Sequence, residues 1–272
     1  STSMGIQSRT VGSVFLSGPL TIAGVIRVYP TVRVDLYSDS GEEFTFGAGF
    51  VWETGPTTSL KLSLAKSFRA PTLSELYYPF MSNPLLAPER GWHADLGFSL
   101  LDDNLRVESA LFFRAMTDEI KYYPPTFIPE NIASSVYAGL EIQLEWEFMP
   151  RVFAEAAYTF LDSFDLSHGA SLADDLRVPL VPMHELHLYL SYRTKQTVIR
   201  AGIDFMSDRY TDATLSDRLP PHLILNANLR HAATDFMTLI LAVDNILNTA
   251  YQLADGYPLP GLTVRVGAEF HF

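Results

Sequence analysis

The chain has 272 residues, of which 47% are hydrophobic, and its 31 acidic and 19 basic residues give a net charge of −12. This charge argues against nucleic acid as a partner, because phosphate binding requires a basic surface. The absence of cysteine excludes disulfides, thiolate metal sites and cysteine nucleophiles. No run approaches the ~18 apolar residues of a transmembrane helix, but transmembrane β-strands need only about 9–11 alternating residues and stay possible.

Apolar and polar residues alternate with a period of two, which a strand produces and a helix does not. Residues 139–148 read GLEIQLEWEF, and residues 262–272 read LTVRVGAEFHF. The polar face of 139–148 carries three carboxylates. Burying each of them in a dry core would cost several kcal/mol, so we expect this face to be wet.

About thirteen segments show this pattern, and their connections alternate between short and long. Outer-membrane barrels have this asymmetry, with short periplasmic turns and long extracellular loops. We therefore predict an all-β fold, a transmembrane antiparallel β-barrel. The predicted strands are 9–17, 20–37, 43–53, 57–68, 91–101, 105–114, 139–148, 151–163, 185–193, 197–207, 222–230, 235–244 and 262–272. Short turns are expected near 17–19, 53–57, 101–104, 149–151, 194–196 and 231–235, and long loops at 69–90, 118–135, 164–182, 208–221 and 245–261, with the turn at 38–42 on the long-loop side.

The strand count leaves two arrangements open. Single-chain bacterial barrels have an even number of strands, with both termini in the periplasm. An odd count of thirteen predicts either a self-closed barrel of about 12–14 strands with one strand missed or merged, or part of a larger barrel. We favour the second. A soluble β-sandwich remains a third alternative, although a sandwich gives no reason for the segregation of loop lengths.

Several stretches resemble the barrel of TonB-dependent outer-membrane receptors. They are FRAPTLSELY at 68–77, NPLLAPE at 83–89, VDNILNTAY at 243–251, GYPLPG at 256–261 and VRVGAEFHF at 264–272. The resemblance implies an energised transporter for scarce, bulky nutrients such as siderophore-iron, haem or cobalamin, with a plug inside a barrel of about 22 strands. So many strands do not fit in this length. We therefore expect residues 1–272 to be a single barrel domain or barrel fragment, without a plug domain.

Aromatic residues beside prolines in two long loops are candidate ligand contacts. Packing of the loops over the barrel rim, or an aromatic girdle at the membrane interface, explains them equally well. The candidates are Tyr77, Tyr78, Phe80, Tyr122, Tyr123 and Phe127.

Charged residues on the polar faces of the strands are predicted to face the lumen. In a complete receptor they would contact the plug, whereas in an open pore they would set ion selectivity. They include Arg106, Glu108, Arg114, Glu141, Glu145, Glu185, Arg193, Arg200, Arg230 and Arg265.

The terminal aromatic residues Phe270 and Phe272 resemble the signal read by the barrel-assembly machinery. No catalytic motif is present, and the acidic loop at 162–175 matches no calcium motif, so we expect no enzyme, no cofactor and no metal site.

These patterns predict a bacterial outer-membrane location. The expected partners are membrane lipid and lipopolysaccharide, the assembly machinery, a small-molecule ligand, and TonB only if a plug is supplied by other sequence. The predicted function is ligand-gated, TonB-dependent transport. The alternatives are a passive pore formed by a smaller closed barrel, and a soluble β-sandwich binding module.

Overall fold

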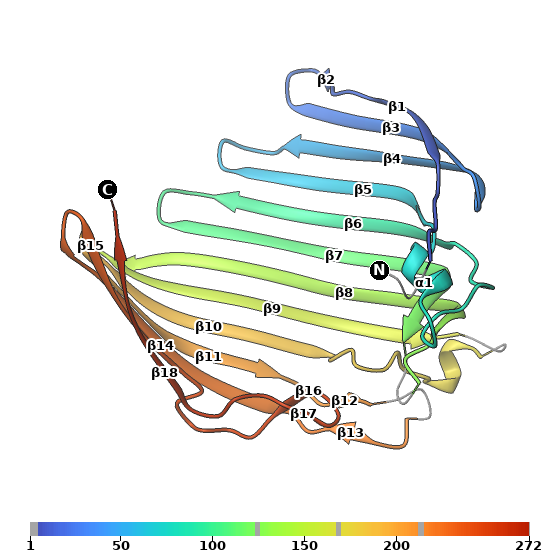
Figure 1. Cartoon of the computed structure of the whole chain (residues 1–272). Coiled ribbons are helices and arrows are strands. Elements are labelled where there is room, and N and C mark those ends of the chain that lie inside the picture. Colours follow the sequence, from blue (N-terminus) through green and yellow to red (C-terminus); the bar gives the residue numbers. More distant parts are fainter. Residues whose placement is uncertain (1–4, 123–125, 167–169, 212–214, 272) are drawn as a thin grey trace.

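A computed structural model describes residues 5–122, 126–166, 170–211 and 215–271. The described chain is almost entirely antiparallel strand and forms one large sheet, curved into an open trough (Figure 1). Its elements are β1 (Val11–Ser17), β2 (Leu20–Ile22), β3 (Ile26–Tyr37), β4 (Gly41–Glu53), β5 (Thr58–Arg69), α1 (Leu73–Tyr77), β6 (Glu89–Leu101), β7 (Leu105–Tyr122), β8 (Pro129–Met149), β9 (Val152–Asp165), the 3-10 helix η2 (Leu172–Asp174), β10 (His184–Arg193), β11 (Thr197–Met206), β12 (Arg209–Tyr210), β13 (Arg218–Leu219), β14 (His222–Thr234), β15 (Met237–Asp244), β16 (Gln252–Ala254), β17 (Tyr257–Pro258) and β18 (Thr263–Phe270).

The strands follow one another in chain order across the large sheet. The path runs β1-β3-β4-β5-β6-β7-β8-β9-β10-β11-β14-β15-β18, and β2 pairs with β3 beside β1. Because β1 and β2 lie end to end, the described residues form thirteen strand positions, which confirms the predicted count. The edge strands β1 and β18 do not pair with each other in the described chain. The closed ring of the smaller-barrel alternative is therefore not formed here.

Loop length segregates to the two ends of the sheet, as predicted. The short turns 54–57, 102–104, 150–151, 194–196 and 235–236 lie at one end, and the long connections, with α1, η2 and the hairpins β12–β13 and β16–β17, lie at the other (Figure 1). Residue 270, the last of β18, lies at the short-turn end. These two ends are called the short-turn end and the long-loop end below.

The turn predicted at 17–19 is wrong. Gly18 and Pro19 interrupt one continuous edge strand, since β1 and β2 share a single register against β3, with Ser17 opposite Thr31 and Leu20 opposite Val28. Proline cannot donate to a ladder, so an edge is the position in a sheet that tolerates it. The chain instead reverses at 23–25, where Ala23 and Gly24 adopt positive φ angles of 52° and 74°.

The long loop predicted at 118–135 is also wrong in extent. β7 and β8 continue far beyond the predicted strands, with Tyr122 still paired to Pro129, so the connection shrinks to 123–128. The carboxylate of Glu119 accepts hydrogen bonds from Ser135 at 2.5 Å and Tyr137 at 2.7 Å, which ties the two extensions together. The polar composition of this segment predicted a loop, but backbone pairing between β7 and β8 extends both strands through it.

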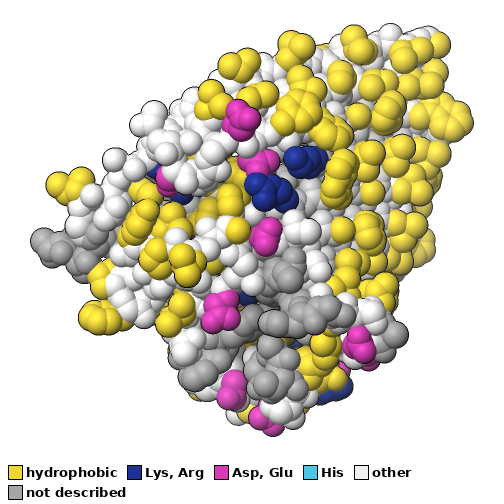
Figure 2. All heavy atoms as spheres, turned by 90° about the vertical axis from the view of Figure 1, so that its right-hand side faces the viewer, with side chains coloured by type: hydrophobic (Ala, Val, Ile, Leu, Met, Phe, Trp, Pro, Cys, Tyr) yellow, Lys and Arg dark blue, Asp and Glu magenta, His cyan; other side chains and the backbone are white. Residues whose placement is uncertain are grey.

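The two faces of the sheet differ sharply in polarity. Leu62, Leu96 and Leu111 are paired in one row across β5, β6 and β7, with exposed side chains from 49% to 54%. Viewed onto the long-loop end, hydrophobic side chains cover most of one flank, whereas charged side chains lie in the middle and lower part of the view (Figure 2). An apolar outer face and a polar inner face are what a lipid-embedded sheet requires. A soluble sandwich would instead cover its apolar face with a second large sheet, and the described residues contain only two further sheets, each a two-stranded hairpin.

Few apolar side chains are buried inside the described chain. Leu76 of α1, Leu86 and Ile120 form a small cluster at the long-loop end. No helix among the described residues is both long enough and apolar enough to cross a membrane.

Candidate functional site

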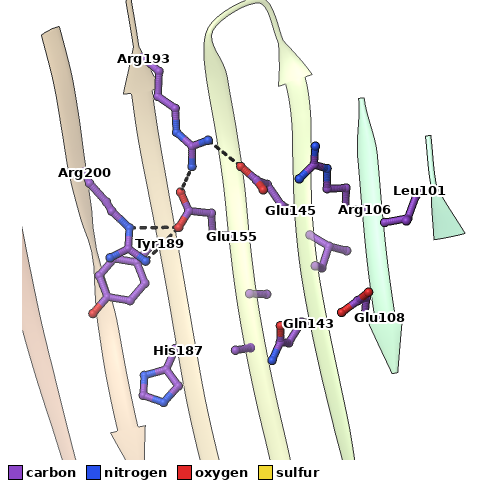
Figure 3. Close-up of a pocket in the computed structure, with 13 residues that line it drawn as sticks. Leu101, Arg106, Glu108, Gln143, Glu145, Glu155, His187, Tyr189, Arg193 and Arg200 are labelled. Carbon is purple, nitrogen blue, oxygen red and sulfur yellow. Dashed lines mark hydrogen bonds and ion pairs between the residues drawn. The ribbon is translucent and has the colours of Figure 1, made fainter. Parts of the chain in front are cut away.

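Several charged side chains gather on the polar face of β7 to β11, toward the short-turn end. These strands place alternate residues on one face, so charges far apart in sequence line one cavity of about 420 Å³ (Figure 3). Its polar lining residues are Arg106, Glu108, Gln143, Glu145, Glu155, His187, Tyr189, Arg193 and Arg200. We call this surface the lumenal cluster.

Glu155 is the centre of the lumenal cluster (Figure 3). One of its oxygens pairs with Arg193 and accepts a hydrogen bond from Ser191 at 3.0 Å, and the other pairs with Arg200 at 2.9 Å. Arg193 reaches on to Glu145 at 2.6 Å. The chain of ion pairs therefore crosses β8, β9, β10 and β11 and ties four strands together.

Aromatic rings stack against Arg193 and Arg200. The guanidinium of Arg200 lies 3.6 Å from the ring centroid of Tyr189, and that of Arg193 lies 4.2 Å from the ring of Phe153. Tyr189 in turn donates a 2.5 Å hydrogen bond to Asp204. Stacking restricts side chains that would otherwise be mobile, so the wall presents a fixed pattern of charge.

The charges of the lumenal cluster nearly cancel. Three arginines face three glutamates in the cavity lining, and His187 contacts Asp204 at 2.5 Å just beyond them. No group of three or more His, Asp or Glu in the described chain is arranged to hold a metal ion. The surface is therefore suited to hydrogen bonds and ion pairs with a polar partner or solute.

Five of the predicted lumen-facing residues meet in this cavity: Arg106, Glu108, Glu145, Arg193 and Arg200. The other five lie elsewhere. Glu141 lines a small neighbouring cavity, and Arg114 lies over the ring of Phe112. Glu185 lies near the first residue of β10, toward the long-loop end. Arg230 pairs with Glu269 at 2.6 Å, and Arg265 pairs with Asp244 at 2.6 Å, both toward the β18 edge.

Sequence analysis missed Glu155 as a site residue, as well as Tyr189 and His187. A local signal for Glu155 existed. Residues 150–151 form a tight turn, so the residue opposite Glu145 across this hairpin faces the same side, and that residue is Glu155. The less regular alternation of 151–163 hid it.

The predicted ligand candidates lie at the long-loop end. Tyr77, the last residue of α1, and Tyr78, which follows it, are partly exposed, and Phe80 is 98% exposed with a positive φ of 66°. Tyr122 donates a 3.0 Å hydrogen bond to Glu75, and Phe127 is half-buried with a positive φ of 52°. Tyr123 lies outside the described residues. These side chains remain candidates, and Phe80 is the one that presents its whole ring to the surroundings.

A charged network fastens this loop to the sheet. Arg69 pairs with Glu89 at 2.6 Å and with Glu75 at 3.1 Å. Glu75 also completes a capping box with Thr72 at the start of α1. Burial raises the pKa of Glu75, but hydrogen bonds from Thr72, Tyr122 and Arg69 more than offset this effect, and the pKa lies below its usual value of 4.5. The FRAPTLSELY stretch therefore has a structural role at 69, 72 and 75.

The VDNILNTAY stretch has a similar role at its asparagine. Asn245 is 2% exposed, and its side chain donates to the carbonyl oxygen of Thr249 at 2.8 Å while accepting from the Thr249 amide at 2.8 Å. Its own amide donates to Asn226 at 3.0 Å. These side-chain hydrogen bonds take the place of the strand-to-strand backbone hydrogen bonds where the chain leaves β15.

Of the predicted assembly signal, Phe270 ends β18 opposite Met237 with its ring half exposed. Phe272 lies outside the described residues.

Comparison with known families decides the identity of this sheet. Residues 1–246 match the model of the TonB dependent receptor-like β-barrel. The chain belongs to this family. Members are outer-membrane β-barrels, which confirms the predicted location and explains the apolar outer face and the uneven loop lengths.

Curated relatives of this receptor barrel include transporters for different nutrients. The vitamin B12 transporter BtuB of Vibrio cholerae serotype O1 is 24% identical over 237 residues, covering 84% of this chain and 37% of that protein. The probable TonB-dependent siderophore receptor PiuA of Acinetobacter baumannii is 23% identical over 184 residues, covering 62% of this chain and 24% of that protein. The chain thus spans well under half the length of these relatives.

Solved structures show the same fold. A variant of the ferric enterobactin receptor PfeA of Pseudomonas aeruginosa superposes with a TM-score of 0.79 at 16% identity, over 97% of this chain and 45% of that one. The copper transporter OprC gives a TM-score of 0.81 at 16% identity, over 97% and 47%. At this identity the likeness establishes the fold alone.

Proposed function

We propose that this chain forms the carboxy-terminal part of the barrel wall of a TonB-dependent receptor that imports a scarce, bulky nutrient of the siderophore-iron, haem or cobalamin class. The family match over residues 1–246 carries the proposal. The relatives are transporters and receptors named for vitamin B12 and siderophores, so we infer a transport role rather than an enzymatic one.

In the proposed mechanism, the long-loop end faces outward and captures the ligand, and a plug within the completed barrel gates its passage when TonB pulls from the inner membrane. The lumenal cluster supports this division of roles. The charges of Glu145, Glu155, Arg193 and Arg200 are paired with one another, so a plug could rest against this part of the wall through hydrogen bonds without breaking an ion pair. Phe80, exposed at the long-loop end, is positioned to meet a ligand.

Membrane partners follow from the same geometry. The outer flank would lie against lipid and, on its outer leaflet, against lipopolysaccharide, and the strand ending at Phe270 would be read by the barrel-assembly machinery. TonB would act through a plug and not through the residues described here.

Uptake tests the proposed function directly. The complete receptor containing this chain is expressed in an outer membrane that lacks its own receptors, and uptake of labelled cobalamin, ferric siderophore and haem is measured with and without TonB. We expect uptake of one class that requires TonB. Uptake that persists without TonB, together with steady conductance in planar bilayers, would support the passive-pore alternative and contradict the proposal.

A further inference from the structure

Three side chains with different donor atoms surround Gly91 on the lumenal face of β5, β6 and β7. Ser67 and Met116 are the register partners of Gly91 on the two neighbouring strands, and His93 is the next residue of β6 on the same face. Met116 and Glu108 are separated by an even number of residues on β7, and Glu108 lines the lumenal cluster. The three side chains therefore lie on the inner wall, nearer the long-loop end than the lumenal cluster.

The donor atoms of these side chains converge on the space beside the Gly91 backbone. A Cβ at Gly91 would lie 2.4 Å from the Sδ of Met116, 2.9 Å from the Oγ of Ser67 and 3.1 Å from the Nε2 of His93. The Oγ and the Nε2 are themselves 2.6 Å apart. Only a residue without a side chain leaves room for this convergence. We call Ser67, Gly91, His93 and Met116 the Gly91 cradle.

The donor set of the Gly91 cradle discriminates between metal ions. Thioether sulfur is a soft ligand that suits Cu(I), and imidazole also binds copper, whereas hard cations prefer carboxylate oxygens. In the described chain, the three atoms nearest to the centre of the cradle are a sulfur, a hydroxyl oxygen and an imidazole nitrogen. The His93 ring lies between the opposite charges of Arg114 and Asp95, so no excess of negative charge draws a divalent ion. A soft, singly charged ion fits this combination best.

The nitrogen and the sulfur are close enough to share one ion. Since both lie near the same point, Nε2 and Sδ are at most about 5.5 Å apart. Metal bonds to imidazole nitrogen and to sulfur are about 2.0 and 2.3 Å long, so one ion bridges atoms up to about 4.3 Å apart. The three rotatable bonds of methionine allow Met116 to adjust any remaining distance. The hydroxyl of Ser67 holds Nε2 toward the cradle until an ion takes its place.

We propose that His93 and Met116 bind one Cu(I) ion in the Gly91 cradle, with Ser67 as a positioning residue for the imidazole. Sequence analysis predicted no metal site, because the two ligands stand on different strands and belong to no metal motif. The wall of the lumen would hold this ion apart from any nutrient captured at the long-loop end. The inference goes beyond the proposed function and does not depend on it.

The test is equilibrium binding of Cu(I) to the complete receptor in detergent, without oxygen and with ascorbate as reductant, measured by competition with a coloured Cu(I) chelator. Wild type is compared with His93→Gln, Met116→Leu and Gly91→Ala. Gly91→Ala keeps both ligands but places a methyl group between them. Heat-modifiable gel mobility verifies that every variant is a folded barrel.

Each variant has a matched control. His231→Gln removes a ring that also contacts a hydroxyl, that of Thr197 at 2.9 Å. Met149→Leu removes a half-exposed thioether at the short-turn end. Gly97→Ala adds a methyl group to the same face of β6, where its nearest neighbour would be 3.4 Å away.

We expect wild type and the three controls to bind one equivalent of Cu(I). Affinity should fall about tenfold or more in His93→Gln, Met116→Leu and Gly91→Ala, since even the loss of an outer partner of a metal ligand costs about 10–100-fold. X-ray absorption of the bound copper should show a sulfur neighbour that disappears in Met116→Leu.

Absence of Cu(I) binding to wild type, tighter binding of Zn(II) than of Cu(I), or unchanged affinity in folded Met116→Leu overturns the inference. These measurements involve neither TonB nor nutrient uptake, so their failure is distinct from failure of the uptake test.

Discussion

At the scale of single residues, Glu155 organises the lumenal wall because it is shared by two arginines. Each arginine is also stacked on a ring, so neither can turn away to water without losing that contact. Removing the shared carboxylate leaves two neighbouring positive charges without their common partner. In the loop layer, by contrast, Arg209 is buried and its Nη2 donates to the carbonyl oxygen of Gln252.

We expect Glu155→Gln to lower the free energy of unfolding by about 1–2 kcal/mol, a value reduced by the partial exposure of the pairs. Glu108→Gln is the control, because Glu108 is half exposed and its partners are distant, with Lys61 at 3.8 Å and the Ser99 hydroxyl at 3.5 Å. This change should alter stability by less than about 0.5 kcal/mol. Urea unfolding of the barrel in lipid vesicles measures both. Equal effects in the two variants would mean that the network at Glu155 adds nothing beyond a surface ion pair.

At the scale of elements, small residues let neighbouring strands and rings fit together. A Cβ at Gly202 in β11 would collide with the carbonyl oxygen of Leu188 and the ring of Tyr189, the ring that supports Arg200. A Cβ at Gly267 in β18 would meet nothing within 4 Å. The two glycines look alike in sequence, and only the neighbouring strands distinguish them.

Gly202→Ala should therefore destabilise the barrel by about 1–3 kcal/mol through overpacking. Gly267→Ala should be close to neutral or slightly stabilising, since alanine restricts the unfolded chain. Thermal unfolding in detergent compares the two. Similar losses in both variants would contradict the predicted role of Tyr189 as the displaced ring.

The 70–88 loop should respond to acid through Glu75. The pKa of this carboxyl is lowered in the folded loop, so its contribution to stability is fully present above its unfolded value of about 4.5 and is lost as the pH falls through the lower folded value. Hydrogen exchange of residues 70–88 should accelerate as the pH is lowered below 4.5, after correction for the intrinsic rate. Glu75→Gln should exchange faster at neutral pH and lose most of this acid dependence. A wild-type loop that is equally protected across this range would contradict the assignment.

At the scale of the whole molecule, the difference between the two faces places the sheet in a membrane. Leu111 and Ala110 are neighbours on β7 that point to opposite faces, Leu111 beside Leu96 and Ala110 beside Glu141. The outer face has no protein covering it in the described chain, and about half of the Leu111 side chain is exposed. Neighbouring positions on one strand therefore separate the effect of lipid from the effect of charge.

Leu111→Arg should cost about 2–4 kcal/mol of folding free energy, because its guanidinium would lie in lipid. Ala110→Arg should cost far less, since it would face water and Glu141. Folding yields into vesicles, read by gel mobility across a urea series, measure both. A larger loss for Ala110→Arg would reverse the assignment of the faces.

How far the sequence predicted this molecule depends on the range of the contacts involved. The thirteen strand positions, the two faces and the two classes of loop were predicted, since each depends on alternation within a dozen residues or on local turn composition. The turn at Gly18–Pro19 was misplaced because pairing of β1 and β2 with β3 continues through it. Half of the predicted lumenal charges meet in one cavity, but Glu155 was not identified because its role depends on neighbours on β8, β10 and β11.

The sequence by itself determined that this protein is built of membrane-type strands, and its motifs pointed to the receptor family, because period-two alternation and short motifs are local properties of a chain. Only the tertiary structure decided which charges are paired and which are left over. Register between strands brings Glu155 to Arg193 and Arg200, and the long connections bury Arg209, whose guanidinium donates to the carbonyl oxygen of Gln252. Pairing and burial depend on residues distant in the chain, so they become visible only when the strands are aligned in space.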